Sequence, residues 1–243
     1  LIDFDHDDLE QTYTEIERFV QAQQNQAILK PDIGAVGKGV IKLSAFERPS
    51  SQLPELSGQY LLQAYCDLPD EFGIFFVRQH GNGRITGINR KHFPTVLGDG
   101  QSTLTQLAQR HERFTKNWQI FMQYQDGDAV LASGEERTLS FIGSHTMGCK
   151  FTNDHQLITP SLTNAIDQFC AQQPGFNFGR LDVRVASEAH LQRGEFVVSE
   201  VNGVASLPTH MFDPDLSVQA AYRIFLQHAK LLVDIAAEHR HQP

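Results

Sequence analysis

Two runs of sequence decide the fold: Gly179-Arg180-Leu181-Asp182-Val183-Arg184 and Val197-Val198-Ser199-Glu200-Val201-Asn202. Polar and apolar residues alternate in both runs, which predicts two strands that each bury one face. Arg180, Asp182 and Arg184 fall on one face of the first strand, while Leu181 and Val183 enter the core. Residues 187–194 are short enough to join the strands as a hairpin. We therefore expect Asp182, Glu200 and Asn202 to converge.

This set of side chains offers two carboxylates and one amide oxygen, the hard donors that Mg²⁺ prefers. Substrate phosphates and water would complete an octahedral site. Arg180 lies two residues from Asp182 and is placed to stabilise charge on a transferring phosphoryl group. The alternative is a network of arginine and acid side chains on the surface of an edge hairpin.

A glycine-rich loop, Gly34-Ala35-Val36-Gly37-Lys38-Gly39, lies between the apolar runs 27–29 and 40–43. Glycine lets backbone N–H groups approach a phosphate closely. The loop leads from strand to strand, unlike the Rossmann and Walker loops, which open a helix. It is expected to act as a flap over a triphosphate, with Lys30 and Lys38 neutralising phosphate oxygens. A plain hairpin with solvated lysines is the alternative.

The remaining pattern mixes strands and helices, which predicts an α+β fold. Strands are expected at residues 60–63, 72–78 and 84–89, the last two joined by the turn at 80–83. Helices are expected at residues 7–24 with Asp7 as the cap, from Thr103 toward His111, at 161–173, and along one apolar face from Ala221 to Ile235.

The composition narrows the class of protein. The chain has 243 residues, 40% of them hydrophobic, and a formal net charge of −9, so it lacks the basic footprint of a nucleic-acid binder. Three scattered cysteines without a CxxC pair indicate a reducing compartment. We expect a cytoplasmic protein without signal peptide or membrane span. Because the chain opens with Leu1, we also expect a longer parent protein.

Taken together, the motifs resemble the ATP-grasp superfamily, especially the D-alanine–D-alanine ligase-like members and the ligase part of cyanophycin synthetase. The resemblance follows nearly the whole chain in order. It rests on Ile28-Leu29-Lys30-Pro31 with the glycine loop, Leu62-Gln63-Ala64-Tyr65, Glu71, Val96-Leu97-Gly98-Asp99-Gly100 with Ser102-Thr103-Leu104, Arg180-x-Asp182, and Glu200-x-Asn202.

The resemblance implies an ATP-grasp fold of two α+β lobes, residues 1–62 and 63–243, that hold ATP between them, without the family's N-terminal subdomain. It implies ligation of a carboxylate to an amine through an acyl phosphate, with ATP and two Mg²⁺ ions, or Mn²⁺, as cofactors. The expected nucleotide-binding residues are Lys30, Gly34, Gly37, Lys38, Gly39, Gln63, Ala64, Tyr65, Cys66 and Glu71. Arg180 is the expected catalytic residue, Asp182, Glu200 and Asn202 the metal ligands, and Arg184, Ser206 and His210 the substrate contacts.

Several alternatives stay open at this point. Asp70 is an alternative to Glu71 as the ribose-binding acid, and either Arg90 or Lys91 is placed to reach a phosphate. His145 is a further candidate for substrate contact. The sequence Gly203-Val204-Ala205-Ser206 departs from the D-alanine ligase pattern, so the substrates are not identified. A nucleotide-binding regulatory module, an ATP-grasp kinase and assembly into a homodimer are also open.

Overall fold

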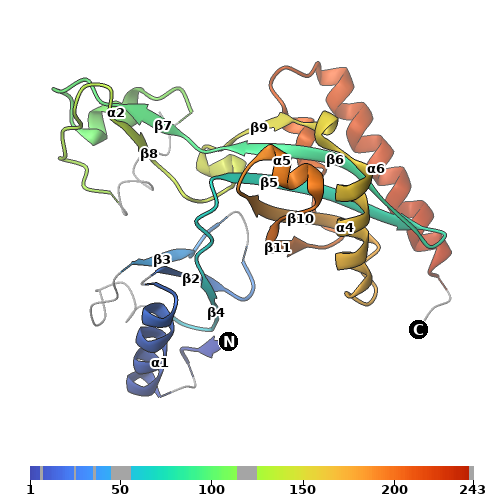
Figure 1. Cartoon of the computed structure of the whole chain (residues 1–243), viewed down its shortest axis with the longest axis horizontal. Helices are drawn as coiled ribbons and strands as arrows, with labels where there is room; N and C mark the ends of the chain where they lie inside the picture. Colours follow the sequence, from blue (N-terminus) through green and yellow to red (C-terminus); the bar gives the residue numbers. More distant parts are fainter. Residues whose placement is uncertain (6–7, 25, 35–36, 45–55, 114–124, 241–243) are drawn as a thin grey trace. The chain divides into compact units, whose positions relative to one another are not determined.

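The computed structural model describes residues 1–240 except 6–7, 25, 35–36, 45–55 and 114–124 (Figure 1). Its contacts divide the chain into two compact units, Leu1–Asp67 and Leu68–Pro243. Both units combine helices with antiparallel strands, so the predicted α+β class is confirmed. Among the described residues, no helix is long and apolar enough to cross a membrane.

Unit 1 is a four-stranded sheet in the order β1-β4-β2-β3 with one helix. The elements are β1 (Ile2–Asp3), α1 (Leu9–Ala22), β2 (Gln26–Pro31), β3 (Ile41–Ser44) and β4 (Gln59–Ala64). Ile16 and Val20 of α1 pack with Ala27 and Leu29 of β2 in the core of the unit. The helix cap corrects the sequence analysis: Asp8 accepts hydrogen bonds from two backbone N–H groups, whereas Asp7 lies outside the described residues.

Unit 2 is built on a five-stranded antiparallel sheet in the order β11-β10-β5-β6-β9. The strands are β5 (Asp70–Gln79), β6 (Asn82–His92), β9 (Lys150–Asn153), β10 (Phe178–Val185) and β11 (Val197–Asn202). The turn between β5 and β6 places His80 and Gly81 at φ of 51° and 76°. Two central residues at positive φ match the twist of a tight hairpin, as glycine at this turn predicts.

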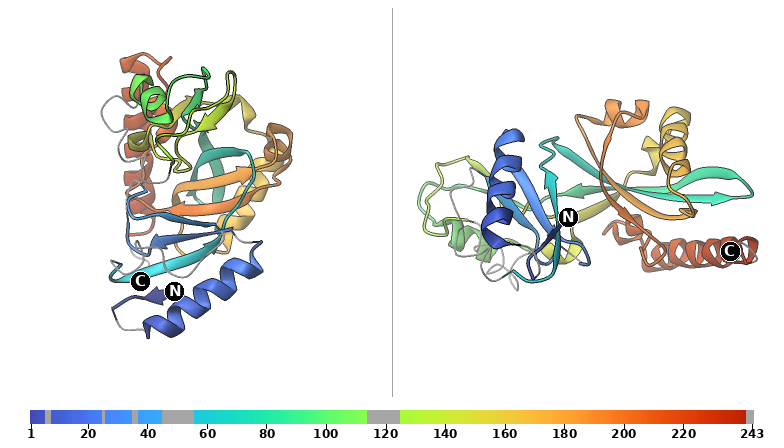
Figure 2. Two further views of the ribbon diagram at one scale, coloured as in Figure 1. Left: turned by 90° about the vertical axis from the view of Figure 1, so that its left-hand side faces the viewer. Right: turned by 90° about the horizontal axis from the view of Figure 1, so that it is seen from below.

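Helices cover both faces of this sheet (Figure 2). On one face, α4 (Pro160–Ala171) and α5 (Glu188–Arg193) bury a large apolar cluster that includes Ile74, Leu181 and Val183. On the other face, α6 (Val218–Glu238) packs through Ile235 against Phe75. The plain hairpin expected between β10 and β11 is wrong in one respect, because α5 occupies their connection and ends at Gly194 in the left-handed region, with φ of 81°.

The remaining described elements of unit 2 are a two-stranded sheet, the helix α2 and short 3₁₀ turns. β7 (Thr95–Leu97) pairs with β8 (Glu136–Thr138), and α2 (Leu104–Arg110) packs beside them. Thr103 and Gln106 form the capping box that the sequence predicts. The 3₁₀ turns are η1 (His145–Met147), η2 (His155–Leu157) and η3 (Thr209–Phe212).

Two buried histidines lie where η3 meets α6. The His210 and His228 rings have centroids 5.4 Å apart, and His210 lies so close to Gly87 of β6 that a Cβ there would be 2.1 Å from its ring. Burial, with smaller contributions from His228 and His155, lowers the pKa of His210 to about 3. His210 is therefore neutral in the folded protein at physiological pH.

This burial makes the stability of unit 2 depend on pH. Because the folded pKa is about 3 and the reference value is 6.5, stability is fully present above pH 6.5 and falls as the pH drops toward 3. At pH 5, the expected loss from this one group is about 2 kcal/mol. Urea unfolding at pH 7.5 and pH 5 measures it. His210→Gln should flatten the difference, whereas His155→Gln, at an exposed histidine that makes only a small contribution to the lowered pKa, should change it little.

Candidate functional site

The strands of unit 2 gather charged side chains on the face of the sheet opposite α4 and α5. Across β10, β5 and β6, the register aligns Arg184 with Glu71 and Lys91. It aligns Asp182 with Gly73 and Asn89 in the next row, and Arg180 with Phe75 and Gly87 in the row after that. We call this surface the site face; its polar members are Glu71, Asn89, Lys91, Arg180, Asp182 and Arg184.

The hairpin prediction is confirmed at the level of the strands. Asp182 pairs with Glu200 and Arg180 with Asn202. Directly opposed residues of an antiparallel pair share a face, so Glu200 and Asn202 extend the site face onto β11. The register shifts after Asp182, where the strand pair has a bulge. At this bulge the Ser199 hydroxyl donates a hydrogen bond to the Asp182 carbonyl at 2.9 Å.

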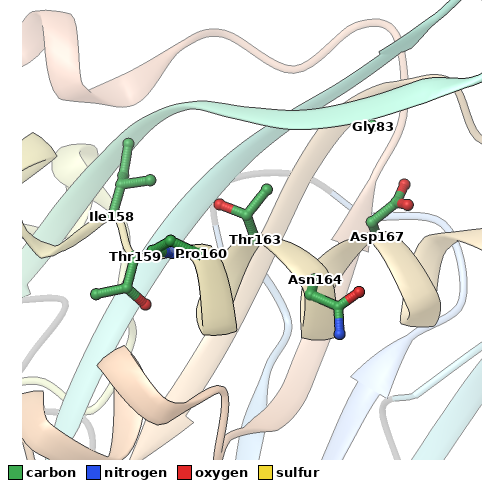
Figure 3. Close-up of a pocket in the computed structure, with 7 residues that line it drawn as sticks. All are labelled: Gly83, Ile158, Thr159, Pro160, Thr163, Asn164 and Asp167. Carbon is green, nitrogen blue, oxygen red and sulfur yellow. The ribbon is translucent and has the colours of Figure 1, made fainter.

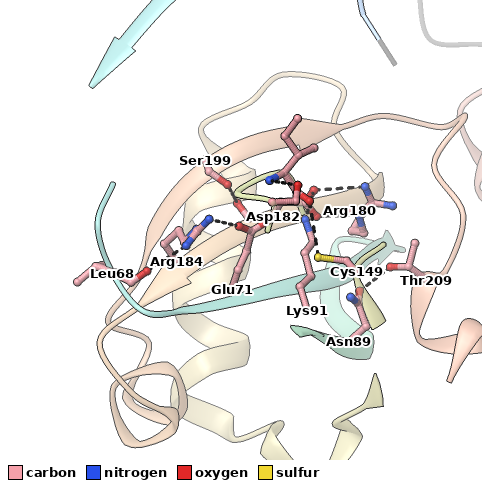
Figure 4. Close-up of polar contacts among 12 residues, drawn as sticks. Leu68, Glu71, Asn89, Lys91, Cys149, Arg180, Asp182, Arg184, Ser199 and Thr209 are labelled. Atoms are coloured by element: carbon pink, nitrogen blue, oxygen red, sulfur yellow. Dashed lines mark hydrogen bonds and ion pairs between the residues drawn. The ribbon is translucent and has the colours of Figure 1, made fainter. Parts of the chain in front are cut away.

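Five charged side chains on the site face form a continuous chain of ion pairs (Figure 4). Arg184 Nη2 lies 2.7 Å from Glu71 Oε2, and Lys91 Nζ lies 2.6 Å from Glu71 Oε1. Lys91 Nζ also lies 2.9 Å from Asp182 Oδ2, and Arg180 Nε lies 2.8 Å from Asp182 Oδ1. Three cations thus alternate with two acids.

This network is buried, which excludes the surface network considered from the sequence. The side chains of Lys91 and Asp182 are each only 4% exposed. Burial alone would raise the pKa of Asp182, but Lys91 and Arg180 outweigh it and hold that pKa below its ordinary value. Burial likewise opposes the charge of Lys91, yet Asp182 and Glu71 raise its pKa. Asp182 and Lys91 therefore stay charged at neutral pH.

Glycine at position 73 is needed for the packing of the site face. Gly73 lies between Asp182 and Asn89 in its row, and a Cβ there would be 2.3 Å from Asn89 Oδ1 and 3.1 Å from Arg180 Cδ. Any side chain at residue 73 would displace both neighbours, so the site face needs glycine at this position.

The predicted metal ligands fit Mg²⁺ by chemistry, with one condition. Asp182, Glu200 and Asn202 supply two carboxylates and an amide from paired strands. Asp182 already pairs with Arg180 and Lys91, so a metal ion must compete with both cations for its oxygens. Within the described ranges, no group of three or more His, Cys, Asp or Glu side chains is arranged to hold a metal. Phosphate oxygens would have to supply the remaining ligands.

The predicted nucleotide residues of unit 1 lie around one face of its sheet. Ala27 and Leu29 point into the core, so the alternating Ile28 and Lys30 occupy the opposite face. Gln63 pairs with Ile28 and shares this face. Ala64 and Tyr65 follow directly, and Cys66 is a half-buried free thiol. Lys42, absent from the candidate set, lies 3.6 Å above the Tyr65 ring.

The glycine loop connects β2 to β3, which pair as an antiparallel hairpin, so the strand-to-strand prediction is confirmed. Gly37 and Gly39 adopt φ of 76° and 77°, a region that side chains rarely occupy. Lys38 lies between them. Gly34 is the first residue of the loop, and a Cβ there would lie 3.6 Å from Pro31 Cβ. Ala35 and Val36 lie outside the described residues.

Replacing Gly37 by valine tests whether this loop binds a nucleotide. Gly37→Val should weaken ATP affinity roughly tenfold, since a β-branched side chain resists positive φ and blocks close approach of the backbone. Gly58→Val is the matched control, because Gly58 has φ of 81° in the same unit but nothing within 4 Å of its Cβ position. Titration with ATP measures both variants. Equal affinities in Gly37→Val and the wild type would make the loop an ordinary hairpin.

Three predicted substrate contacts are engaged elsewhere. His210 is 4% exposed and packs against Gly87, so its side chain is buried, and the predicted substrate contact would need that packing to open. Ser206 donates its hydroxyl to the Gly203 carbonyl at 2.7 Å. Arg184 pairs with Glu71 and donates to the Leu68 carbonyl at 3.1 Å, the structural pairing that competes with a substrate role. The further candidate, His145, stacks on Phe212 with the two ring centroids 5.5 Å apart.

The two candidates Arg90 and Lys91 are separated by strand alternation. Arg90 points to the face that α4 and α5 cover, where it pairs with Asp154 at 2.7 Å and with Glu188. Lys91 points to the site face, between Glu71 and Asp182. Glu71 itself is 6% exposed and pairs with Lys91 and Arg184, and its role as the ribose-binding acid stays a prediction. Of the two residues that the sequence offers for a phosphate contact, Lys91 is therefore the one that lies on the site face.

A pocket on the opposite side of the sheet does not belong to this site (Figure 3). It lies between the β5–β6 hairpin and α4, and it is lined by Gly83, Ile158, Thr159, Pro160, Thr163, Asn164 and Asp167. Asp167, the one ionisable side chain of its lining, is paired with Arg78 at 2.5 Å. Since no cluster of charged groups converges there, we assign the chemistry to the site face.

Comparison with known proteins finds no matching family model and no matching curated protein. The solved structures to which the chain is similar include ligases and synthetases by their descriptions. PsnB, an ATP-grasp ligase complexed with minimal precursor, Mg and ADP, gives 13% identity and a TM-score of 0.46, with 91% of this chain and 50% of that chain covered. D-alanyl-alanine synthetase A from Vibrio cholerae gives 12% identity and a TM-score of 0.42, with 94% of this chain and 56% of that chain covered.

A bifunctional glutathione synthetase from Pasteurella multocida gives 13% identity and a TM-score of 0.42, and the chain covers 33% of it. The chain thus spans about a third to three-fifths of the length of the matched structures. At these identities and TM-scores, the function of this chain has to be inferred from its motifs and its own site geometry.

Proposed function

We propose that this chain binds ATP with Mg²⁺ and catalyses the ATP-dependent coupling of a carboxylate to an amine. The observation that carries the proposal is the buried network on the site face. It holds three cations against two acids and adjoins Glu200 and Asn202 at the sheet edge. A surplus of positive charge beside hard-oxygen donors suits a nucleotide whose phosphates share a metal ion.

Each residue has a definite part in this proposal. Asp182, Glu200 and Asn202 would hold Mg²⁺, which when bound neutralises charge on the phosphate oxygens. Lys91 and Arg180 would exchange a carboxylate partner for phosphate oxygens. In unit 1, Lys30 and the backbone of the glycine loop would bind phosphate, and the Gln63–Cys66 segment would bind the adenine base.

The reaction proceeds in two displacements. A carboxylate oxygen of the first substrate attacks the γ-phosphorus, the bond from that phosphorus to the β–γ bridging oxygen breaks, and ADP leaves. The amine nitrogen of the second substrate then attacks the acyl carbon, phosphate leaves, and the nitrogen loses a proton. Arg180 stabilises negative charge on the phosphoryl group and then on the tetrahedral oxyanion.

A screen of amino acids and small peptides for stimulated release of ADP tests this function. A ligase releases ADP at full rate only when carboxylate and amine are both present, and the product contains a new amide bond detectable by mass spectrometry. An ATP-grasp kinase would release ADP with one substrate alone and leave a phosphorylated product. A regulatory module would bind ATP without releasing ADP under any condition of the screen.

A further inference from the structure

A short segment after β11 crosses the site face. Residues 203–208, which we call the strap, leave the sheet at Asn202 on the edge strand β11 and enter η3 at Thr209. η3 lies over β6 and β9, on the far side of β10 and β5. The strap therefore spans β5 and β10, and β10 carries both Asp182 and Arg180.

Two contacts fix the strap to the site face. At its end, the Thr209 hydroxyl donates to Asn89 Oδ1 at 2.5 Å, and both residues are buried. One residue before Pro208, the Leu207 carbonyl accepts a hydrogen bond from Arg180 Nη1 at 3.5 Å. Arg180 is thus held by Asp182 on one side and by the strap on the other.

The side chain of Asn89 is buried and only partly satisfied by the residues that the structure describes. It is 1% exposed, and its amide nitrogen has no hydrogen-bond partner among the described residues. A buried amide is costly unless it is satisfied, so leaving one donor unpaired needs a compensating function for the side chain. Its contact with Thr209 joins residues that are 120 positions apart. Asn89 and Thr209 therefore hold the end of the strap to β6 through their side chains. Among the described residues, no backbone-to-backbone hydrogen bond joins the strap to the strands of the sheet.

We propose that Asn89 and Thr209 form a clamp that positions the strap and, through the Leu207 carbonyl, positions the guanidinium of Arg180. The role given to Arg180 rests on the proposed ligase function, whereas the clamp itself does not. Asn89 and Thr209 are positioning residues, because they act on the reacting groups only through Arg180.

Amide hydrogen exchange tests the clamp with a pair of matched variants. Thr209→Val removes the hydroxyl at nearly constant volume, and Thr209→Ser retains it. Two amides report on the segment, since Ser206 N–H donates to the Gly203 carbonyl at 3.0 Å and Met211 N–H donates to the Pro208 carbonyl at 2.9 Å. We expect Thr209→Val to speed exchange at both about tenfold, Thr209→Ser to restore protection, and the amides of α6 to stay unchanged.

Unchanged exchange at Ser206 and Met211 in Thr209→Val would overturn the clamp. An equal rise along α6 would also overturn it, because the hydroxyl would then serve only general stability. With a substrate from the screen, Thr209→Val should lower kcat about tenfold at an unchanged KM for ATP, and Thr209→Ser should restore kcat. If the screen finds no ligase activity, the proposed function fails while the exchange result still decides the clamp.

Discussion

Asp182→Asn is expected to lower the rate of substrate-dependent ADP release at least ~100-fold while the protein stays folded. The change removes the negative charge that would hold Mg²⁺, but it keeps the shape of the side chain and an oxygen for Arg180. Asparagine is the informative replacement because alanine would leave Lys91 and Arg180 without any oxygen acceptor at this position, whereas asparagine keeps one. Steady-state kinetics and thermal unfolding, measured on the same preparation, separate the two effects.

Glu200→Gln extends this test to the exposed edge of the site. Glu200 is exposed, so removing its charge breaks none of the buried ion pairs, and its effect on turnover reports mainly on the metal, with a smaller effect through its charge on Arg180. Glu195→Gln is the matched control, an exposed acid in the same region that pairs with Arg193. If Asp182→Asn and Glu200→Gln both keep normal turnover, the metal site lies elsewhere.

Strand alternation places Arg180 and Arg184 on the same site face, but we expect Arg180→Lys to lower turnover and Arg184→Lys to lower stability. Arg180→Lys keeps the charge but loses the fork that serves Asp182 and the Leu207 carbonyl. Its kcat should fall roughly 10–100-fold with little change in KM for ATP. Arg184→Lys should mainly lower the melting temperature, because Arg184 ties Glu71 to the Leu68 carbonyl and lies over the Phe93 ring at 4.9 Å.

The sequence analysis gave Arg184 a different role, a grip on the substrate carboxylate. A higher KM for the substrate in Arg184→Lys, with stability and kcat unchanged, would restore that role and contradict the structural pairing proposed here. A loss of ATP affinity in Arg180→Lys that matched the loss of kcat would place Arg180 in ground-state binding rather than in catalysis.

Local patterns made part of this site predictable. The period-two alternation in residues 179–184 places Arg180 and Asp182 opposite Leu181 and Val183, and the structure confirms that division. The strand-to-strand connection at the glycine loop is predicted by the run 40–43 that follows it, which is too short and β-branched for the start of a helix. The capping box at Thr103 is a signal within four residues.

The ion-pair network was not predictable because it depends on strand order. Glu71 and Lys91 meet Asp182 only since β5 lies between β6 and β10, an arrangement that no local pattern specifies. Their burial also reverses the usual expectation that charged residues on a strand face water. The helix α5 was missed although Gly194 marks its end, because residues 187–194 are also compatible with a plain hairpin connection.

Binding of ATP with Mg²⁺ to the wild-type chain is the most direct test of the central claim. A ligand that binds only the folded state stabilises it by mass action, by about 2.7 kcal/mol at a concentration one hundred times Kd. We predict that saturating ATP with Mg²⁺ raises the melting temperature, that Asp182→Asn loses most of the rise, and that EDTA abolishes most of it in the wild type. No rise with ATP and Mg²⁺, or a rise of equal size in EDTA, would contradict a metal-dependent nucleotide site on this chain.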